Sequence, residues 1–186
     1  MSETILQLLD ENYTEDTDDV EYLAKVIRNY SRILASGATI EVPRRVLQNV
    51  INNECLTVPL AKNLMLECHD DERRAWTINN ILIANKSEEI IDAAWGLLPK
   101  SEWHNVIDRL LFNTDSVSDK IKIDYIKHVI ENKDKEEFNP AFVAFMAAKS
   151  DCPIEALKAI YENKYDLPLS NHTIKLIEER LNDNED

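Results

Sequence analysis

Proline and glycine are placed along this chain in a way that leaves room for little but helices. The 186 residues include six prolines and only two glycines. The prolines are Pro43, Pro59, Pro99, Pro140, Pro153 and Pro168. Each stands directly before, or in the first turn of, a segment with helical apolar spacing, where its missing N–H group would have no partner and its φ already suits the helix. The pattern predicts an all-α chain of short helices and short loops.

The spacing of apolar residues predicts about eleven helices. Their expected ranges are 2–9, 20–36, 43–52, 59–68, 71–84, 87–98, 101–112, 118–132, 140–148, 153–161 and 170–181. One of Thr17, Asp18 and Asp19 is expected to cap the helix that begins at residue 20, and Gly37 to end it. The helix over 140–148 is almost wholly apolar, so we expect it to be central.

The connections between these helices are short, which makes neighbours antiparallel αα-hairpins. Three helix starts share an apolar–Pro–apolar pattern, at Val58-Pro59-Leu60, Cys152-Pro153-Ile154 and Leu167-Pro168-Leu169. From Val42 to the end, this pattern resembles the helix openings of degenerate HEAT-like and related α-superhelical repeats. The resemblance implies an irregular right-handed α-superhelix, and a compact helical bundle is the alternative.

Acidic residues are concentrated at the two ends of the chain, whose formal net charge is −14. Residues 1–21 hold eight acids and no Lys or Arg. We expect an acidic segment with a short helix over 1–19, a single helical domain over 20–181 and an acidic disordered tail over 182–186. The nearly neutral body gives little reason to expect direct nucleic-acid binding, which depends on clustered Lys and Arg.

The cysteines and the apolar segments indicate a cytoplasmic protein that is not bound to a membrane. Cys55, Cys68 and Cys152 are odd in number and show no CxxC spacing, so no disulfide framework or four-cysteine zinc site is indicated. A signal peptide and a membrane-spanning segment are not expected either, because no basic stretch with an apolar run follows Met1 and no apolar run is long enough.

Common enzyme motifs are missing from the sequence. GxGxxG needs three glycines, Gly37 and Gly96 are too far apart for GxxxxGK[ST], and neither GxSxG nor HExxH occurs. We therefore expect no enzyme, no cofactor and no bound metal. One exception is weighed: His69-Asp70 is similar to the central pair of metal phosphohydrolases, with further ligands available among His104, His128 and His172. Acids at this helix-to-helix corner also suit ordinary N-caps.

Basic residues gather in one part of the sequence. Lys25, Arg28 and Arg32 follow i, i+3, i+7 spacing on the helix over 20–36, and Arg44 and Arg45 begin the next helix. This group is either a solvated polar face or a stripe that binds an acidic peptide or a phosphate group.

A tryptophan extends the set of candidate partner-binding residues. Trp103 stands beside Glu102 and His104 at a helix start, and tryptophan is enriched in binding hot spots. Its apolar flank makes a place in the core the other interpretation.

Helical-repeat surfaces serve mainly as scaffolds, so we predict a non-enzymatic interaction scaffold, adaptor or regulator that binds another protein. The predicted contact residues are Lys25, Arg28, Arg32, Arg44, Arg45 and Trp103. The alternative is an acidic inhibitor that mimics nucleic acid and binds a basic, nucleic-acid-binding protein. A metal-dependent hydrolase using His69 and Asp70 is a third hypothesis.

Overall fold

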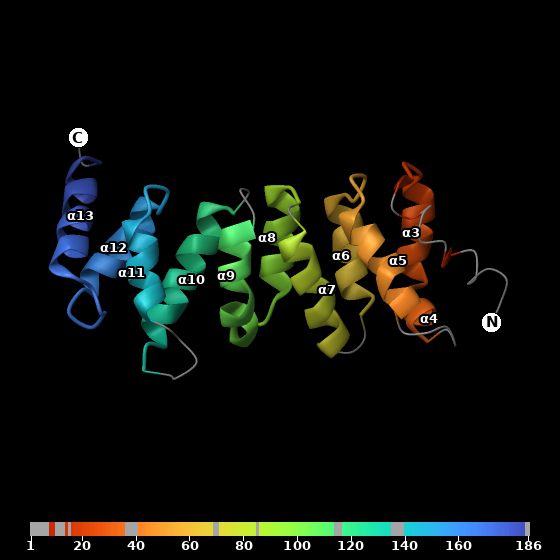
Figure 1. The fold of residues 1–186 in the computed structure, drawn as a ribbon, viewed down its shortest axis with the longest axis horizontal. Helices are drawn as coiled ribbons and strands as arrows, with labels where there is room; N and C mark the ends of the chain where they lie inside the picture. The colour runs from red at the N-terminus through yellow and green to blue at the C-terminus, as the bar shows by residue number, and fades with distance from the viewer. Residues whose placement is uncertain are drawn as a thin grey trace. The chain divides into compact units, whose positions relative to one another are not determined.

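The computed structural model describes residues 8–9, 14, 16–35, 41–68, 71–84, 86–113, 117–134 and 140–184. In these ranges it contains eleven α-helices, one 3-10 helix and no strand, which confirms the predicted all-α class (Figure 1). The α-helices are α3 (Val20–Arg28), α4 (Tyr30–Leu34), α5 (Glu41–Asn52), α6 (Val58–Leu66), α7 (Asp71–Ile83), α8 (Glu88–Leu97), α9 (Trp103–Asn113), α10 (Asp119–Glu131), α11 (Pro140–Ala148), α12 (Ile154–Glu162) and α13 (Asn171–Asn182). The 3-10 helix is η1 (Lys100–Glu102).

The prolines stand at helix starts, as the sequence predicts. Pro59 occupies the first turn of α6, Pro140 is the first residue of α11, and Pro153 is the N-cap of α12. Pro99 is the N-cap of η1. A proline at these positions removes no hydrogen bond from the helix, because the first N–H groups have no intrahelical partner.

Polar side chains cap several of the same starts. The Asp19 carboxylate accepts a hydrogen bond from the Tyr22 N–H at 2.9 Å, and this confirms Asp19 as the cap of α3. Ser118 caps α10 and Ser170 caps α13, each accepting from the backbone N–H three residues later. Such caps stabilise a helix by about 0.5–2 kcal/mol each.

The helix predicted over 20–36 is interrupted at Asn29, and this is a difference from the sequence analysis. Asn29 has φ −101° and ψ 11°, and its side-chain Nδ2 donates to the Lys25 carbonyl at 2.8 Å. The Asn29 backbone N–H also donates to the Lys25 carbonyl, at 3.2 Å, so the side chain shares this carbonyl with the backbone. Leu23, Ile27 and Tyr30 are nevertheless all buried, so the buried face keeps its helical phase across the break. Gly37 and most of the helix predicted over 2–9 lie outside the described residues.

The chain divides into two compact units, unit 1 over residues 1–116 and unit 2 over residues 117–186. In unit 1 the described helices make two series of contacts. In the first series α6 contacts α3 and α8. In the second, α5 contacts α4 and α7, and α7 contacts α9. The two series meet where α7 contacts α6 and α8. Their fully buried side chains, which form the core of the unit, include Leu47, Leu64, Ile78 and Ile91.

Unit 2 packs α11 against α10, α12 and α13, while α12 also contacts α10 and α13. Only one face of α11 is buried, through Val143, Met146 and Ala147, and Phe145 is 43 % exposed. The expectation that this helix is central is therefore wrong for the face that carries Phe145. Its uniform apolar sequence contains no signal that would show which face packs.

The described helices are too short or too polar to span a membrane.

The last helix extends slightly further than the sequence predicts. Helix α13 ends at Asn182, which is the first residue of the predicted tail, and Asp183 is its C-cap. The single domain predicted over 20–181 stays a prediction.

Candidate partner-binding surface

The five basic residues predicted to bind a partner all lie on the surface of unit 1. Lys25 and Arg28 belong to the last turn of α3, where a cation interacts favourably with the negative end of the helix dipole. Arg32 is on α4, and Arg44 and Arg45 are on α5. The helical phase continues across Asn29, so the spacing of Lys25, Arg28 and Arg32 in the sequence predicts correctly that their side chains are exposed.

The structure distributes these five residues between the two contact series of unit 1. Lys25 and Arg28 lie on α3, which packs against α6. Arg32, Arg44 and Arg45 lie on α4 and α5, which contact each other and, through α5, reach α7. The sequence treats them as one basic focus. By helix they form an α3 pair, Lys25 and Arg28, and an α4–α5 group, Arg32, Arg44 and Arg45.

A cavity of about 280 Å³ lies beside the α3 pair, between α3 and α6. Its lining residues are Ala24, Ile27, Arg28, Leu60, Asn63 and Glu67. Three of these residues are apolar, and two of the three, Ile27 and Leu60, are buried. The three residues from α3, and Leu60 and Asn63 from α6, stand at helical spacing, and Glu67 is the C-cap of α6.

The other three lining residues are charged or polar. Arg28 and Asn63 are exposed, while Glu67 is half-buried. The side chains of Lys25 and Arg28 form no ion pair or hydrogen bond within the part of the chain that the structure describes. Arg28 is thus not neutralised by Glu67, although both line the cavity.

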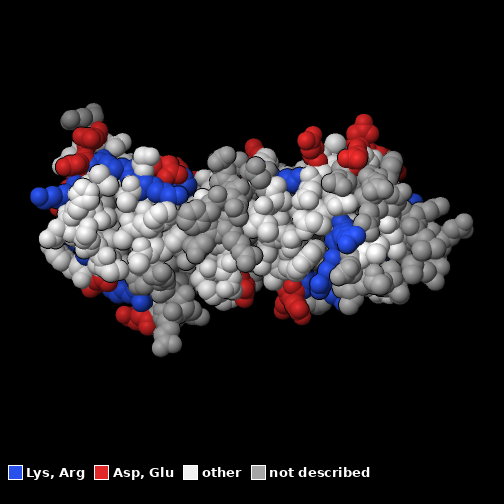
Figure 2. Space-filling view, in the orientation of Figure 1, with Lys and Arg blue, Asp and Glu red and all other residues white. Residues whose placement is uncertain are grey.

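A second basic area lies over α5 and α7, where Figure 2 shows Lys and Arg side chains gathered on one face of unit 1. The basic residues of these helices are Arg44, Arg45, Arg73 and Arg74. Arg74 has a structural role, since its Nη2 donates to the Cys68 carbonyl at 2.9 Å. Arg73 is exposed and was missed by the sequence analysis, because only the packing of α5 on α7 relates it to Arg44 and Arg45.

Trp103 belongs to the core instead. It is 7 % exposed, stacks on Trp95 with ring centroids 4.5 Å apart, and donates from Nε1 to the Leu98 carbonyl at 3.2 Å. A ring that is already stacked and hydrogen-bonded gains little from a partner. This burial does not fit the predicted role in partner binding.

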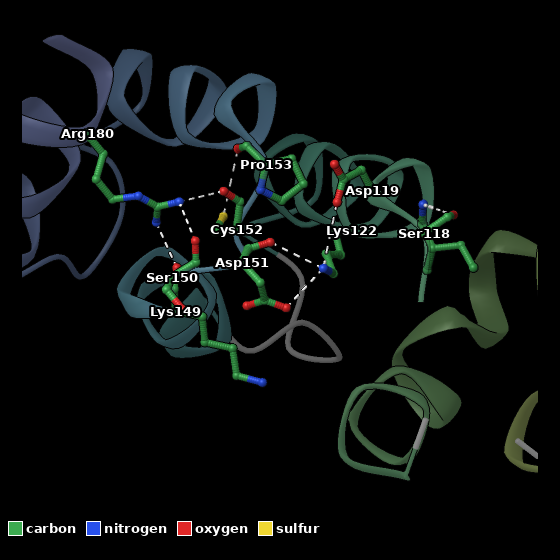
Figure 3. A network of polar contacts seen from close by, with 10 residues as sticks. Ser118, Asp119, Lys122, Lys149, Ser150, Asp151, Cys152, Pro153 and Arg180 are labelled. Atoms are coloured by element: carbon green, nitrogen blue, oxygen red, sulfur yellow. Dashed lines mark hydrogen bonds and ion pairs between the residues drawn. The ribbon is translucent and has the colours of Figure 1, made fainter. Parts of the chain in front are cut away.

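Unit 2 contains a polar network around the turn between α11 and α12 (Figure 3). The side chain of Lys122 is only 9 % exposed, and its Nζ donates to Asp151 at the carboxylate (3.0 Å) and the backbone carbonyl (3.2 Å). The hydrogen bond from Lys122 lowers the pKa of the Asp151 carboxyl below its ordinary value. Asp119 adds a longer contact with Lys122 at 3.7 Å.

Arg180 of α13 reaches the same turn from the other side (Figure 3). Its guanidinium donates to the carbonyls of Lys149 at 2.7 Å, Ser150 at 3.0 Å and Cys152 at 2.8 Å. Burial raises the pKa of the Cys152 thiol to about 11. The hydrogen bonds and ion pairs of this network join residues of the same unit, so we interpret it as structural.

The acidic N-terminal segment is attached to unit 1 through Asn53. The buried Asn53 donates from Nδ2 to the carbonyls of Thr14 (3.1 Å) and Thr17 (2.9 Å) and accepts from the Cys55 N–H (2.8 Å). The Thr14 hydroxyl also lies 3.3 Å from the Tyr22 hydroxyl. These contacts hold part of the segment at a defined place on the helical body.

The residues of the hydrolase hypothesis are only partly visible. His69 and Asp70 lie outside the described residues, while His104, His128 and His172 stand on α9, α10 and α13. Within the described ranges, no group of three or more His, Cys, Asp or Glu side chains could hold a metal ion.

No family model matches this chain, and no curated protein or solved structure matches it either.

Proposed function

We propose that this chain is a non-enzymatic scaffold or adaptor that binds another protein through unit 1. The observation that supports this most is the α3 pair, Lys25 and Arg28, which is exposed beside the cavity between α3 and α6. Protein interfaces combine an apolar centre with polar surroundings and are enriched in arginine. The cavity lining brings the apolar Ala24, Ile27 and Leu60 together with the cation of Arg28.

The packing of each unit supports a surface of the repeat type. Helices two places apart along the chain contact each other, as α5 does α7 and α6 does α8 in unit 1, and as α10 does α12 and α11 does α13 in unit 2. Stacked αα-hairpins make contacts of this kind. We therefore propose the irregular right-handed α-superhelix over the compact bundle, and small-angle scattering would distinguish the two.

The scaffold proposal is tested by capturing a partner, purifying it, and measuring its affinity for defined variants. The test variant is Lys25→Glu/Arg28→Glu, and the control is Lys158→Glu/Lys175→Glu, which makes the same change in charge at exposed positions of α12 and α13. We expect the test variant to bind at least about tenfold more weakly, because a charge-assisted hydrogen bond contributes about 1.5–3 kcal/mol.

Both variants should keep the helical circular dichroism of the wild type, since none of the four side chains is buried. Equal affinity of the test variant and the wild type would remove the α3 pair from the interface. A chain that captures no protein at all under cross-linking conditions would contradict the scaffold function itself.

The acidic inhibitor remains a second candidate, because Asn53 holds the acidic segment at a defined place. Asp16 and Asp18 are exposed there, whereas Asp19 is occupied as the cap of α3. A mimic of nucleic acid needs acids in fixed positions, which this attachment supplies.

The acidic inhibitor is tested by neutralising acids, since deleting residues 1–19 would also remove the buried Thr14 and Thr17. With Asp16→Asn/Asp18→Asn, the inhibitor hypothesis predicts weaker binding to a captured partner that DNA can displace. The scaffold hypothesis predicts no change.

A further inference from the structure

We infer that the outward face of α5 and α7 binds an extended segment of a partner polypeptide, through side-chain amides that pair with the backbone of that segment. The inference adds a contact surface to the scaffold function proposed above and names the kind of segment that this surface fits. It uses other residues than the α3 pair, and all of them belong to unit 1.

Helices α5 and α7 occupy equivalent places in successive helical hairpins. Each buries four residues in the pattern i, i+1, i+4, i+5, and the second set follows the first by 31 positions. The buried residues are Val46, Leu47, Val50 and Ile51 on α5, and Thr77, Ile78, Ile81 and Leu82 on α7. Because the buried faces of the two helices match residue by residue, their outward faces match as well.

The outward positions of both helices carry amide side chains. Gln48 and Asn49 stand between the two buried pairs of α5, and Asn79 and Asn80 hold the equivalent positions of α7. All four residues are half-buried, so their side chains lie at the surface. Since α5 contacts α7, the equivalent outward residues of the two helices form one row of amides.

Three of these amides have hydrogen-bonding groups to spare within the part of the chain that the structure describes. Asn80 donates one N–H to the Trp76 carbonyl at 2.7 Å, and Gln48 donates one to the Asn52 side-chain oxygen at 3.2 Å. Asn79 forms no hydrogen bond there, and its Oδ1 is covered by the protein. A primary amide has two donors and an acceptor oxygen with two lone pairs, so each of the three can bind a further group.

The covered oxygen of Asn79 is the observation that points to a ligand. A buried acceptor without a partner destabilises the folded chain, so the stability of α7 does not account for an asparagine at this position. A rotation of the side chain brings the oxygen to the surface, where an N–H group of a bound segment would pair with it. Binding would then recover free energy that the unbound chain loses.

The distance between packed helices matches the spacing of residues in an extended peptide. Axes of packed helices are about 8–10 Å apart, and an extended chain rises by about 3.3 Å per residue. A segment that crosses both helices therefore presents peptide groups three residues apart to Gln48 and Asn79. Each amide donates and accepts as a peptide group does, so it can pair with the N–H and the C=O of one residue.

A nucleic-acid backbone fits this row less well than a polypeptide does. Phosphate oxygens accept hydrogen bonds but donate none, so they would leave the Asn79 oxygen without a partner. Charge does not favour a phosphate either, because Asp71 and Glu72 stand in the first turn of α7 beside Arg73. We therefore choose the extended polypeptide as the occupant.

The probe is a phage-displayed library of random peptides, selected on the immobilised full chain. A length of about 12 residues extends over about 40 Å, which is enough to cross both helices. Enriched peptides are then synthesised with a fluorescein label, and their affinities are measured by anisotropy. We expect Asn79→Ala/Asn80→Ala to bind them at least about tenfold more weakly and Gln48→Ala about fivefold more weakly, as the loss of one or two hydrogen bonds predicts.

The matched control is Asn171→Ala/Asn182→Ala, which removes two exposed amides from α13 and should leave the affinity unchanged. Asn79→Ala alone should not lower the melting temperature, because the oxygen that it removes has no partner. Gln48→Ala on α5 keeps the test valid if the double variant of α7 unfolds.

A second measurement examines the backbone of the peptide. Replacing one backbone amide of the peptide by an ester removes an N–H group and keeps every side chain. We expect the affinity to fall most at two positions three residues apart, since those N–H groups pair with the two helices.

Three results would overturn the inference. The first is a selection that enriches no peptide, and the second is equal affinity of the enriched peptides for the wild type, Asn79→Ala/Asn80→Ala and Gln48→Ala. The third is displacement of the peptides by a single-stranded oligonucleotide that binds more tightly. None of these decides the scaffold function, which depends on the captured partner and on the Lys25→Glu/Arg28→Glu variant.

Discussion

Replacing Arg180 by methionine is expected to destabilise unit 2, because one guanidinium there holds a whole interhelical turn. Its three hydrogen bonds reach carbonyls that lie 28 to 31 residues earlier in the chain, after the end of α11. Methionine keeps a long unbranched side chain, so most of the packing of Arg180 is retained. The change therefore isolates the three hydrogen bonds and the charge.

The magnitude follows from how exposed each of these bonds is. The bond to Ser150 is exposed, so water replaces it at little cost, while the bonds to Lys149 and Cys152 are partly buried. A charged donor contributes about 1.5–3 kcal/mol to a hydrogen bond, and we take the lower limit for each of the two partly buried ones. The free energy of unfolding should fall by about 3 kcal/mol.

Urea unfolding measures this loss in the full chain with two signals. Circular dichroism reports the helices of both units, whereas Trp76, Trp95 and Trp103 all belong to unit 1, so fluorescence reports that unit alone. With an m-value of about 1–3 kcal/mol/M, the transition of unit 2 should shift by about 1–3 M urea. Arg180→Lys keeps the charge but fewer of the bonds, and about half of the loss is expected.

The matched control is Lys175→Met, which removes an exposed cation from the same helix. Surface substitutions of this kind change stability by about 0.5 kcal/mol or less. If Arg180→Met costs no more than Lys175→Met, water satisfies the three carbonyls as well as Arg180 does, and the reasoning is refuted.

Two further predictions concern titration and thiol chemistry. Lys122 lowers the pKa of Asp151, so the pair stabilises the folded state above the ordinary carboxyl pKa of 3.8 and loses that effect as the pH falls through the lowered value. The difference in free energy of unfolding between the wild type and Lys122→Met should therefore shrink from pH 7 to pH 3, and a difference independent of pH would contradict the pairing. In the folded chain at pH 8, a thiol reagent such as DTNB should modify Cys55 rapidly and the buried Cys68 and Cys152 slowly, because burial raises the pKa of Cys152 to about 11. Cys55→Ser should abolish the fast phase. A fast phase that remains in this variant would mean that Cys68 or Cys152 is accessible to the reagent, which contradicts their burial.

Helix starts could be predicted from the sequence because the groups that define them are local. Ser118 and Ser170 bond to N–H groups only three residues away, and Pro59 and Pro153 act within a single turn. The interruption at Asn29 is local as well, but an asparagine inside an apolar pattern shows no sign of whether its amide will bind the carbonyl four residues earlier.

The candidate site could be predicted only in part. Helical spacing shows that Lys25 and Arg28 are exposed, since the apolar residues between them must face the core. The cavity depends on how α3 packs on α6 and on the small size of Ala24. The lining residues of the two helices are more than thirty positions apart in the sequence. The contacts of Lys122 and Arg180 span similar separations, so periodicity within one helix carries no information about them.

The attachment of the N-terminal segment by Asn53 has a consequence for how this sequence can vary. Asn53 donates to the backbone carbonyls of residues 14 and 17. Because the acceptors are backbone atoms, these bonds do not require particular side chains at positions 15 and 16. Substitutions between those residues are therefore tolerated, whereas inserting or deleting one residue there would move one of the two carbonyls out of reach. In this stretch of the chain, length is under stronger constraint than charge.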